Sequence, residues 1–308
     1  MILAFKTGKG STDGLFDKFG KEGEEKIKVC EFDTKRYFDD NPFLISKLIK
    51  NPTHPNAKLY WHDLYDKSLD VDSYMFWGFM RGTKTIYEKA LETKKDFYFF
   101  DHAYVYHKKH SIFLERLAAN PFFRMVKNEF VLTTIKDTDD TKLLQMRKDY
   151  SKIKDLDILP WNKKGSYILI IPPSVWLCNY IGIDAEQMMK DSIETIKKHT
   201  DREIKIRYKK PDGDYNPTPL EKDIDSAWAV VSFQSSAAIK AVNRGVPSFL
   251  MKPGYSATQP VSLTDLSKIE TPFYPDNRYE WLSSICNNQF LKHEITTGKA
   301  YRYLNEHN

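Results

Sequence analysis

Three serines, Ser232, Ser235 and Ser236, lie where an apolar run gives way to a helical pattern. The run at residues 227–231 suits a buried strand, and residues 237–242 place apolar side chains at helical spacing. The free backbone N–H groups at a helix start bind anions, and small hydroxylated residues let a phosphate come close. Serine is also a common helix cap. The residues alone therefore leave a capping role and a phosphate site equally open for this serine turn (residues 232–236).

A second strand follows the helix. Arg244-Gly245 closes the helical pattern, and Pro247 lies near the start of the next apolar run. Strand, turn, helix, glycine and strand form the order of a βαβ unit. The segment resembles the donor-binding βαβ unit of GT-B glycosyltransferases, in its details that of bacterial capsule-type sugar transferases. Those enzymes share a Ser/Thr pair, a Glu and an Arg-Gly-x-Pro ending, and Ser235, Ser236, Arg244, Gly245 and Pro247 fit this pattern.

Lys240 departs from the pattern, because it stands where those enzymes usually carry the Glu that holds the nucleotide ribose. A lysine cannot accept hydrogen bonds from ribose hydroxyls, although it could contact a phosphate. The resemblance therefore implies the fold and a phosphate-bearing ligand more strongly than any one nucleotide. The expected ligand is a nucleotide-sugar donor, with a UDP-sugar as the first candidate, and the sequence does not require a divalent metal.

A basic stretch accompanies the strand predicted at residues 203–208, where Lys205, Arg207 and Lys209 alternate with other residues and so point the same way. A solvated basic edge strand would show the same pattern. The similar GT-B families place an Arg at this strand end to hold donor phosphates, a role that Arg207 fits. The predicted donor- and phosphate-binding residues are Arg207, Lys209, Ser174, Ser235, Ser236 and Lys240.

The first half of the chain contains another strand–helix–strand pattern. An apolar run at residues 74–80 leads to Arg81, residues 83–94 have a helical pattern, and a second apolar run ends in Asp101-His102. In open α/β sheets, ligands bind beyond the carboxyl ends of the strands. We therefore expect Arg81, Asp101 and His102 to line the same cleft.

Three segments of this half resemble a group of phage-borne proteins that are associated with glycosyltransferases of modified phage DNA. The segments are Trp77-Gly78-x-x-Arg81-Gly82, Asp101-His102-Ala103-Tyr104 and Phe123-Arg124-x-x-Lys127-Asn128. Similarity to the DNA base glucosyltransferases of phages is in architecture only.

Sugar transfer with inversion needs a base for the acceptor hydroxyl. Asp101, beside His102, is the candidate for this catalytic role, although an aspartate that caps a turn is at least as common. Arg81, Arg124 and Lys127 are the candidates for holding acceptor phosphates. The sequence predicts no metal site, because its Asp-x-Asp pairs are too numerous to be specific and the histidines near His102 lack matching ligands.

The chain of 308 residues is long enough for two domains of about 150 residues each. We expect an α/β fold of two Rossmann-like domains that face each other across a cleft, as in GT-B enzymes. The predicted acceptor domain spans residues 1–160 and the nucleotide-sugar-binding domain spans residues 161–290. A helix at residues 291–308 can pack back on the first domain.

The overall composition indicates the cellular compartment and the kind of partner to expect. No apolar run approaches the ~20 residues of a membrane span, and the three cysteines are far apart and odd in number, which favours reduced thiols in a cytoplasm. If a phage encodes the chain, that cytoplasm is the host's. The net charge of +5 is compatible with a polyanionic partner such as double-stranded DNA.

Three functions remain open from the sequence. The first is transfer of a sugar from a nucleotide sugar to a hydroxymethylated pyrimidine base in phage DNA. The second is glycosyl transfer to a capsule or envelope polysaccharide. The third is a non-catalytic GT-B-like protein that binds a nucleotide or DNA. The sequence does not name the sugar, the stereochemical outcome, the metal dependence or the oligomeric state.

Overall fold

The computed structural model describes residues 2–6, 27–31, 71–78, 83–105, 122–149, 154–208 and 218–307. The chain forms two compact units. The first comprises Met1–Phe130, Asn179–Gly182 and Asn288–Asn308, and the second comprises Val131–Cys178 and Ile183–Asn287. The chain thus enters the second unit about thirty residues before the boundary expected at residue 160, and its last residues belong to the first unit.

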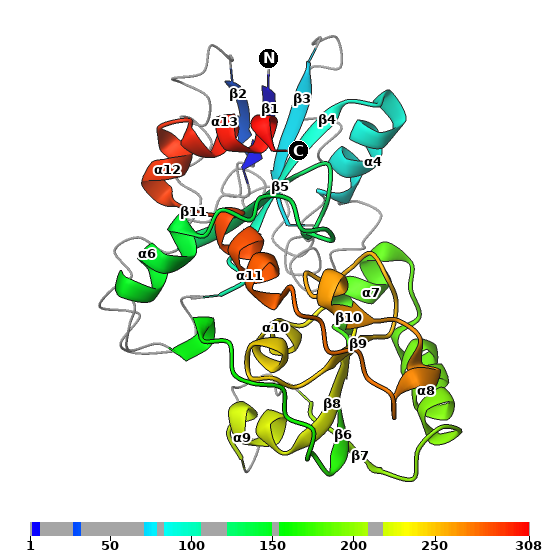
Figure 1. Cartoon of the computed structure of the whole chain (residues 1–308). Helices are drawn as coiled ribbons and strands as arrows, with labels where there is room; N and C mark the ends of the chain where they lie inside the picture. The colour runs from blue at the N-terminus through cyan, green and yellow to red at the C-terminus, as the bar shows by residue number, and fades with distance from the viewer. Residues whose placement is uncertain are drawn as a thin grey trace. The chain divides into compact units, whose positions relative to one another are not determined.

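The first unit is built on a six-stranded sheet in the order β11-β5-β4-β3-β1-β2 (Figure 1). Strands β2, β1, β3 and β4 run parallel, and β5 and β11 are antiparallel to their neighbours. The strand bounds are β1 Ile2–Lys6, β2 Ile27–Glu31, β3 Ser73–Trp77, β4 Asp96–His102, β5 Phe122–Lys127 and β11 Gln289–Leu291.

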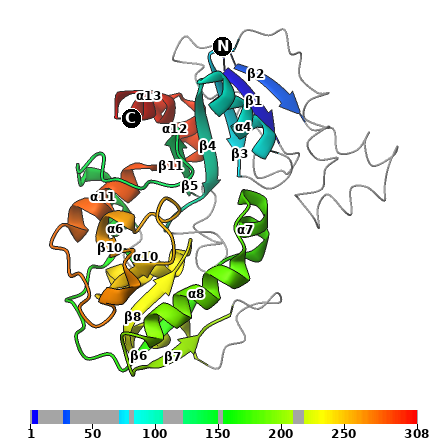
Figure 2. The same cartoon turned by 90° about the vertical axis from the view of Figure 1, so that its right-hand side faces the viewer.

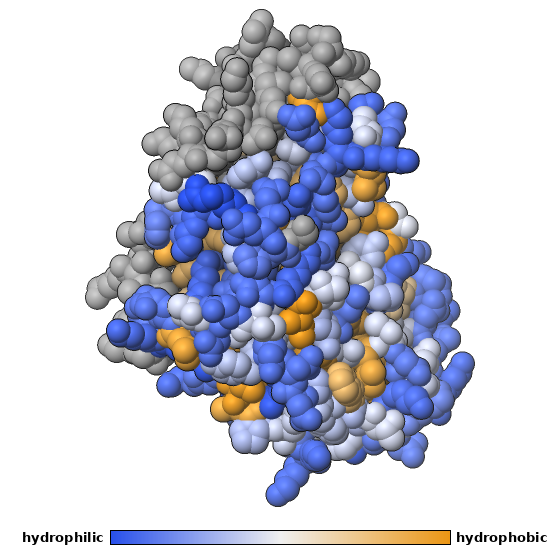
Figure 3. Space-filling model, turned by 45° about the horizontal axis from the view of Figure 1, so that its top comes forward, coloured by the Kyte–Doolittle hydropathy of each residue, from blue (hydrophilic) through white to orange (hydrophobic). Residues whose placement is uncertain are grey.

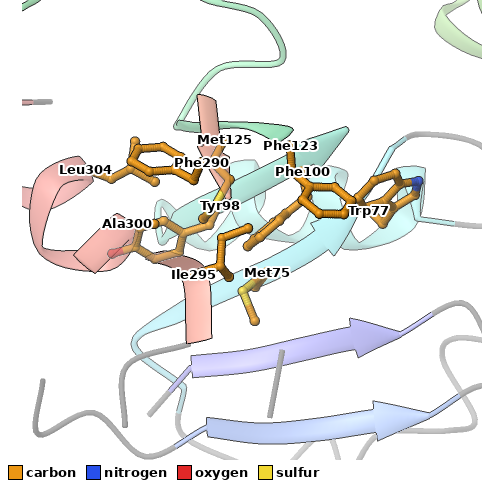
Figure 4. Close-up of a cluster of buried hydrophobic side chains, with 10 residues drawn as sticks. All are labelled: Met75, Trp77, Tyr98, Phe100, Phe123, Met125, Phe290, Ile295, Ala300 and Leu304. Carbon is orange, nitrogen blue, oxygen red and sulfur yellow. The ribbon is translucent and has the colours of Figure 1, made fainter. Parts of the chain in front are cut away.

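Helices cover both faces of this sheet. On one face, Tyr87 of α4 (Lys84–Thr93) packs edge-on against Phe97 of β4. On the other, Ile295 of α12 (Lys292–Thr296) and Leu304 of α13 (Lys299–Glu306) join a buried cluster with Tyr98 and Phe100 (Figure 4). Because β3 and β4 are buried on both faces, their sequences read as nearly continuous apolar runs rather than as alternating ones.

The second unit has a five-stranded parallel sheet in the order β10-β9-β8-β6-β7. Its strands are β6 Tyr167–Ile171, β7 Glu203–Ile206, β8 Ala227–Ser232, β9 Ser248–Leu250 and β10 Ser262–Leu263. Its α-helices are α6 Thr141–Asp149, α7 Val175–Ile181, whose last residues belong to the first unit, α8 Ala185–Lys197, α9 Leu220–Asp225, α10 Ser236–Asn243 and α11 Arg278–Asn287. Short 3-10 helices are η2 Lys154–Leu156, η3 Gln259–Val261 and η4 Leu266–Lys268.

This sheet is also covered on both faces. Ile196 of α8 packs with Ile168, Ala229 and neighbouring side chains on one face, where Figure 2 shows α8 running along the sheet. On the other face, Ala241 of α10 packs with Leu169 and a second group of strand residues. Parallel strands with helices on both faces make each unit Rossmann-like, so the predicted α/β class with two such units is confirmed. A cleft between them stays a prediction.

The strand order has one reversal point in each unit. In the first unit, β1 lies between β2 and β3, and in the second, β6 lies between β7 and β8. In each sheet, successive strands are therefore added on opposite sides of a central strand, which is β1 in the first unit and β6 in the second. Doubly wound sheets bind ligands beyond the carboxyl ends of the strands at such a switch point. In the second unit this places the ends of β6 and β8 at the expected ligand edge.

No helix among the described residues is both long and apolar enough to cross a membrane. On the face of the molecule drawn in Figure 3, hydrophobic side chains form small separate patches among hydrophilic ones. Scattered apolar side chains of this kind are normal on a protein surface.

Candidate functional site

The serine turn connects the end of β8 to the start of α10. Ser232 is the last residue of β8, and Ser235 is the N-cap of α10, where its Oγ accepts a hydrogen bond from the Ala237 N–H at 3.1 Å. The capping role that the sequence left open is therefore filled by Ser235. Ser236 is exposed at the first helical position.

Ser232 is the less ordinary member of the turn. Its side chain is fully buried, and its Oγ has no hydrogen-bond partner. Val230 packs against Ala241 of α10, and alternation along the strand places Ser232 on that same face. A buried hydroxyl without a partner costs about 1–3 kcal/mol, so native proteins seldom keep one without a ligand, a water or a function.

Ser174 lies at the same edge of the sheet. It follows β6 by three residues, is exposed, and accepts a hydrogen bond from the Leu177 N–H at 3.4 Å. Because Ile171 of β6 pairs with Ser232 of β8, both strands end at the same level. The structure thus brings Ser174 and the serine turn to the carboxyl edge at the switch point.

Arg207, the predicted phosphate-binding arginine, is buried, with only 6 % of its surface exposed. Its Nη1 donates to the Asp223 carboxylate and to the Thr218 carbonyl oxygen, the latter at 2.9 Å. Burial raises the pKa of the Asp223 carboxyl, but hydrogen bonds from Thr218 and Arg207 outweigh burial, and the pKa lies below its ordinary value. Arg207, directly after β7, is therefore linked to Asp223 of α9 through a buried ion pair.

Lys240 is also engaged by acidic side chains. Its Nζ forms ion pairs with the Glu221 carboxylate and, at 3.4 Å, with Asp155. Burial lowers the pKa of the Lys240 amine, but the hydrogen bond to Glu221 and the charge of Asp155 outweigh this and raise it. Arg244 binds both oxygens of Asp225 in a forked contact.

The acidic helix α9 therefore supplies an ion-pair partner for three basic residues that the sequence analysis singled out, Arg207, Lys240 and Arg244. Its three carboxylates and their cations are Glu221 with Lys240, Asp223 with Arg207, and Asp225 with Arg244. The sequence analysis missed this role of α9. The signal was the acidic alternation Glu-x-Asp-x-Asp at residues 221–225. Since these cations are already paired, the exposed hydroxyls of Ser174 and Ser236 remain the groups most open to a phosphate at this edge.

Gly245 of the Arg-Gly-x-Pro ending has a structural explanation. Its φ of +77° is the left-handed conformation that glycine adopts readily, and an added Cβ would lie 2.0 Å from the Pro160 carbonyl oxygen. The glycine is thus required by the close approach of two backbone segments, whatever the ligand.

We expect Gly245→Ala to lower the free energy of unfolding by about 3 kcal/mol, from the left-handed strain and the backbone clash together. Gly254→Ala is the matched control, because Gly254 has a φ of +89° but no atom within 4 Å of an added Cβ. That variant should lose about 1 kcal/mol. Urea denaturation measures the free energy of unfolding of both variants. Equal losses in the two would show that the backbone clash at Gly245 costs nothing.

In the first unit, Asp101 lies near the carboxyl end of β4 with 28 % of its side chain exposed. Its Oδ2 accepts a hydrogen bond from Arg124 Nη2 at 2.6 Å, and its Oδ1 accepts one from the His102 backbone N–H at 2.7 Å. His102 is exposed, and its ring meets Trp77 edge-on with 5.3 Å between centroids. The structure therefore pairs Asp101 with Arg124, whereas the His102 side chain points to the opposite face of β4 and His102 donates to Asp101 through its backbone N–H.

Lys127 does not join them. It lies three residues from Arg124 on β5, so the two side chains point to opposite faces of the sheet. Lys127 Nζ contacts Asp96 at 2.8 Å and Asn305 at 3.0 Å, at the other end of β4. Arg81 and Lys209 lie outside the described residues. No group of three or more metal-ligating side chains occurs in the parts of the chain that the structure describes.

No family model and no curated protein matches the sequence. Among solved structures, the chain is similar to the β-Kdo 2,7 transferase of Thermosulfurimonas dismutans KpsC, at 10% identity and a TM-score of 0.45, over 98% of this chain and 99% of that one. The β-Kdo 2,4 transferase of the same KpsC gives 9% identity and a TM-score of 0.47, over 92% and 89% of the two chains. The UDP-GlcNAc 2-epimerase of Methanocaldococcus jannaschii gives 8% identity and a TM-score of 0.28, over 91% and 96%. With TM-scores below 0.5, these likenesses decide neither the fold nor the activity of this chain.

Proposed function

We propose that the chain is a glycosyltransferase that moves a sugar from a nucleotide sugar to a hydroxyl acceptor. The observation that carries the proposal is the buried, unpartnered hydroxyl of Ser232 at the switch point of the second sheet, directly before the N-terminus of α10. A helix N-terminus attracts negative charge, and Ser232 adds a donor that no protein group uses. A donor phosphate is the ligand that fits both.

The chemistry follows from these groups. The acceptor oxygen bonds to the anomeric carbon of the sugar while the bond from that carbon to the donor phosphate oxygen breaks. Asp101 takes the proton of the acceptor hydroxyl, and the nucleotide phosphate leaves with the bonding electrons. Hydroxyls and the backbone N–H groups of α10 stabilise the leaving charge, because fixed dipoles aimed at developing charge lower the barrier.

For the donor we propose a UDP-sugar, and for the acceptor a hydroxymethylated pyrimidine base in double-stranded DNA, within the cytoplasm where that DNA lies. The support is the resemblance of the three first-half segments to phage-borne proteins and the net charge of +5. Such an enzyme must expose or flip the target base. The Arg244-Gly245-x-Pro247 ending supports the capsule or envelope glycan alternative instead, although the clash at Gly245 gives that glycine a structural reason.

A transfer assay separates these functions. The full chain is incubated with labelled UDP-sugars and either hydroxymethylated DNA, unmodified DNA or a glycan acceptor. We expect label on hydroxymethylated DNA alone. Label on the glycan alone would replace the DNA proposal with the second function. The absence of both sugar transfer and donor hydrolysis would favour the third function, a non-catalytic binding protein.

Ser232→Ala should have opposite effects on stability and on binding. Removing a buried hydroxyl that has no partner should raise the free energy of unfolding by about 1 kcal/mol, whereas loss of a phosphate donor should weaken nucleotide binding about tenfold. Thermal unfolding and equilibrium dialysis with the nucleotide measure the two effects. Ser248→Ala is the matched control, because Ser248 Oγ is also buried and unpartnered but lies at the start of β9. If both variants bind nucleotide equally well, Ser232 is not part of a phosphate site.

A further inference from the structure

We infer that Arg124 is a positioning residue that orients the Asp101 carboxylate, and that it does not bind acceptor phosphate. The inference rests on the proposed function, in which Asp101 is the base. Both carboxylate oxygens are fixed, Oδ2 by Arg124 Nη2 at 2.6 Å and Oδ1 by the His102 N–H at 2.7 Å. The Asp101 side chain is still 28 % exposed, so a ligand can reach the carboxylate. Holding a reacting group in one geometry is a large part of catalysis.

Arg124 itself is poorly placed to meet a ligand. Only 11 % of its side chain is exposed, and its guanidinium carbon lies 5.7 Å from the Phe99 ring centre and 5.2 Å from that of Tyr104. Burial lowers the pKa of the Arg124 guanidinium, but the charge of Asp101 and the interaction with Tyr104 together outweigh burial and raise it, so the group stays charged. The two rings hold the guanidinium plane in place.

The support for this pair extends across three strands. Asp101 of β4 pairs in register with Arg124 of β5, which pairs with Gln289 of β11. Gln289 is fully buried, and its Oε1 accepts a hydrogen bond from the Val105 N–H at 2.8 Å. This bond fixes the segment after β4 that carries Tyr104 against Arg124. The orientation of Asp101 thus depends on a strand contributed by the last part of the chain.

A further nitrogen of the Arg124 guanidinium is also turned away from solvent. Arg124 Nε is buried and has no acceptor. Asp101 is the acidic side chain that the structure pairs with this guanidinium. An arginine evolved to hold a ligand phosphate would present its fork to solvent, because the fork matches phosphate through two parallel hydrogen bonds. Arg124 instead directs its fork inward and toward Asp101.

The two roles of Arg124 separate in kinetics. Arg124→Lys keeps the positive charge, loses the planar fork, and is more conservative for folding than Arg124→Met, which serves as the second variant. A positioning role predicts a fall in kcat of about 10²-fold, with the KM for acceptor within about twofold of wild type. An acceptor-binding role predicts the reverse, a raised KM with kcat unchanged, and that result would overturn the inference.

A double variant tests whether Arg124 acts through Asp101. Adding Arg124→Lys to Asp101→Asn should lower residual kcat by less than about twofold, since coupled residues are not additive. Full additivity would overturn the inference. Asp96→Asn is the matched control, because it breaks the Lys127–Asp96 pair at the other end of β4 and should leave both constants unchanged. If the wild-type chain transfers sugar to no acceptor, the proposed function fails and this inference fails with it. If the wild-type chain is active and the Arg124 variants raise the KM for acceptor with kcat unchanged, only this inference is overturned.

Discussion

Asp223→Asn should lower the free energy of unfolding by about 3–5 kcal/mol, the largest stability effect that we expect in this chain. Asp223 and Arg207 have side-chain exposures of 7% and 6%, so removing one charge leaves the other buried without its opposite charge in this pair. Thr218 Oγ1 also donates to Asp223 at 2.6 Å, and that bond is weakened as well. Chemical denaturation at neutral pH gives the value directly.

Two further variants make this result specific. Asp225→Asn removes a carboxylate from the same helix. Its ion pair with Arg244 is more exposed, at 45% of the Asp225 side chain and 26% of the Arg244 side chain, so the free energy of unfolding should fall by at most about 1 kcal/mol. The double variant Asp223→Asn/Arg207→Met should recover much of the lost stability, because a buried pair can often be replaced by apolar groups. A double variant as unstable as Asp223→Asn alone would show that the cost does not come from the buried arginine.

Asp101→Asn should reduce the rate of sugar transfer by about 10²–10⁴-fold, because an amide cannot accept the proton of the acceptor hydroxyl. Nucleotide binding should be retained, since Asp101 belongs to the first unit and the serine turn to the second. Single-turnover kinetics measures the loss, and equilibrium dialysis with the nucleotide measures binding. The assay temperature should lie well below the unfolding transition, because the substitution also removes the partner of Arg124.

Full activity in Asp101→Asn would remove Asp101 as the base. Loss of nucleotide binding together with loss of transfer would instead indicate misfolding, and circular dichroism of the variant would show it.

Regular patterns in the sequence predicted much of the second unit. Residues 227–231 and 237–242 correspond to β8 and α10, and Arg244 and Gly245 follow the helix as expected. Asp184, three residues before Gln187 as in a capping box, is the N-cap of α8 and accepts the Gln187 N–H at 3.0 Å. These features depend on residues close in sequence, so periodicity and capping chemistry reveal them.

What the sequence did not reveal depends on residues far apart in the chain. The charges of Arg207 and Lys240 indicated anion binding, but their partners on α9 become neighbours only when β7, α9 and α10 pack together. Arg124 was expected to hold acceptor phosphate, whereas only 11 % of its side chain is exposed and it pairs with Asp101 of the neighbouring strand β4. The strand expected at residues 203–208 also ends earlier, at Ile206, so Arg207 lies beyond β7, where it bonds to Asp223 of α9.

The central claim, that the serine turn binds donor phosphate, is tested most directly by thermal unfolding of the wild-type chain with a panel of nucleotides and nucleotide sugars. A ligand that binds the folded state raises its apparent stability by about 2.7 kcal/mol at a hundred times its Kd. We predict a selective rise in the midpoint temperature with uridine nucleotides, which Ser232→Ala reduces. No rise with any member of the panel would contradict the claim.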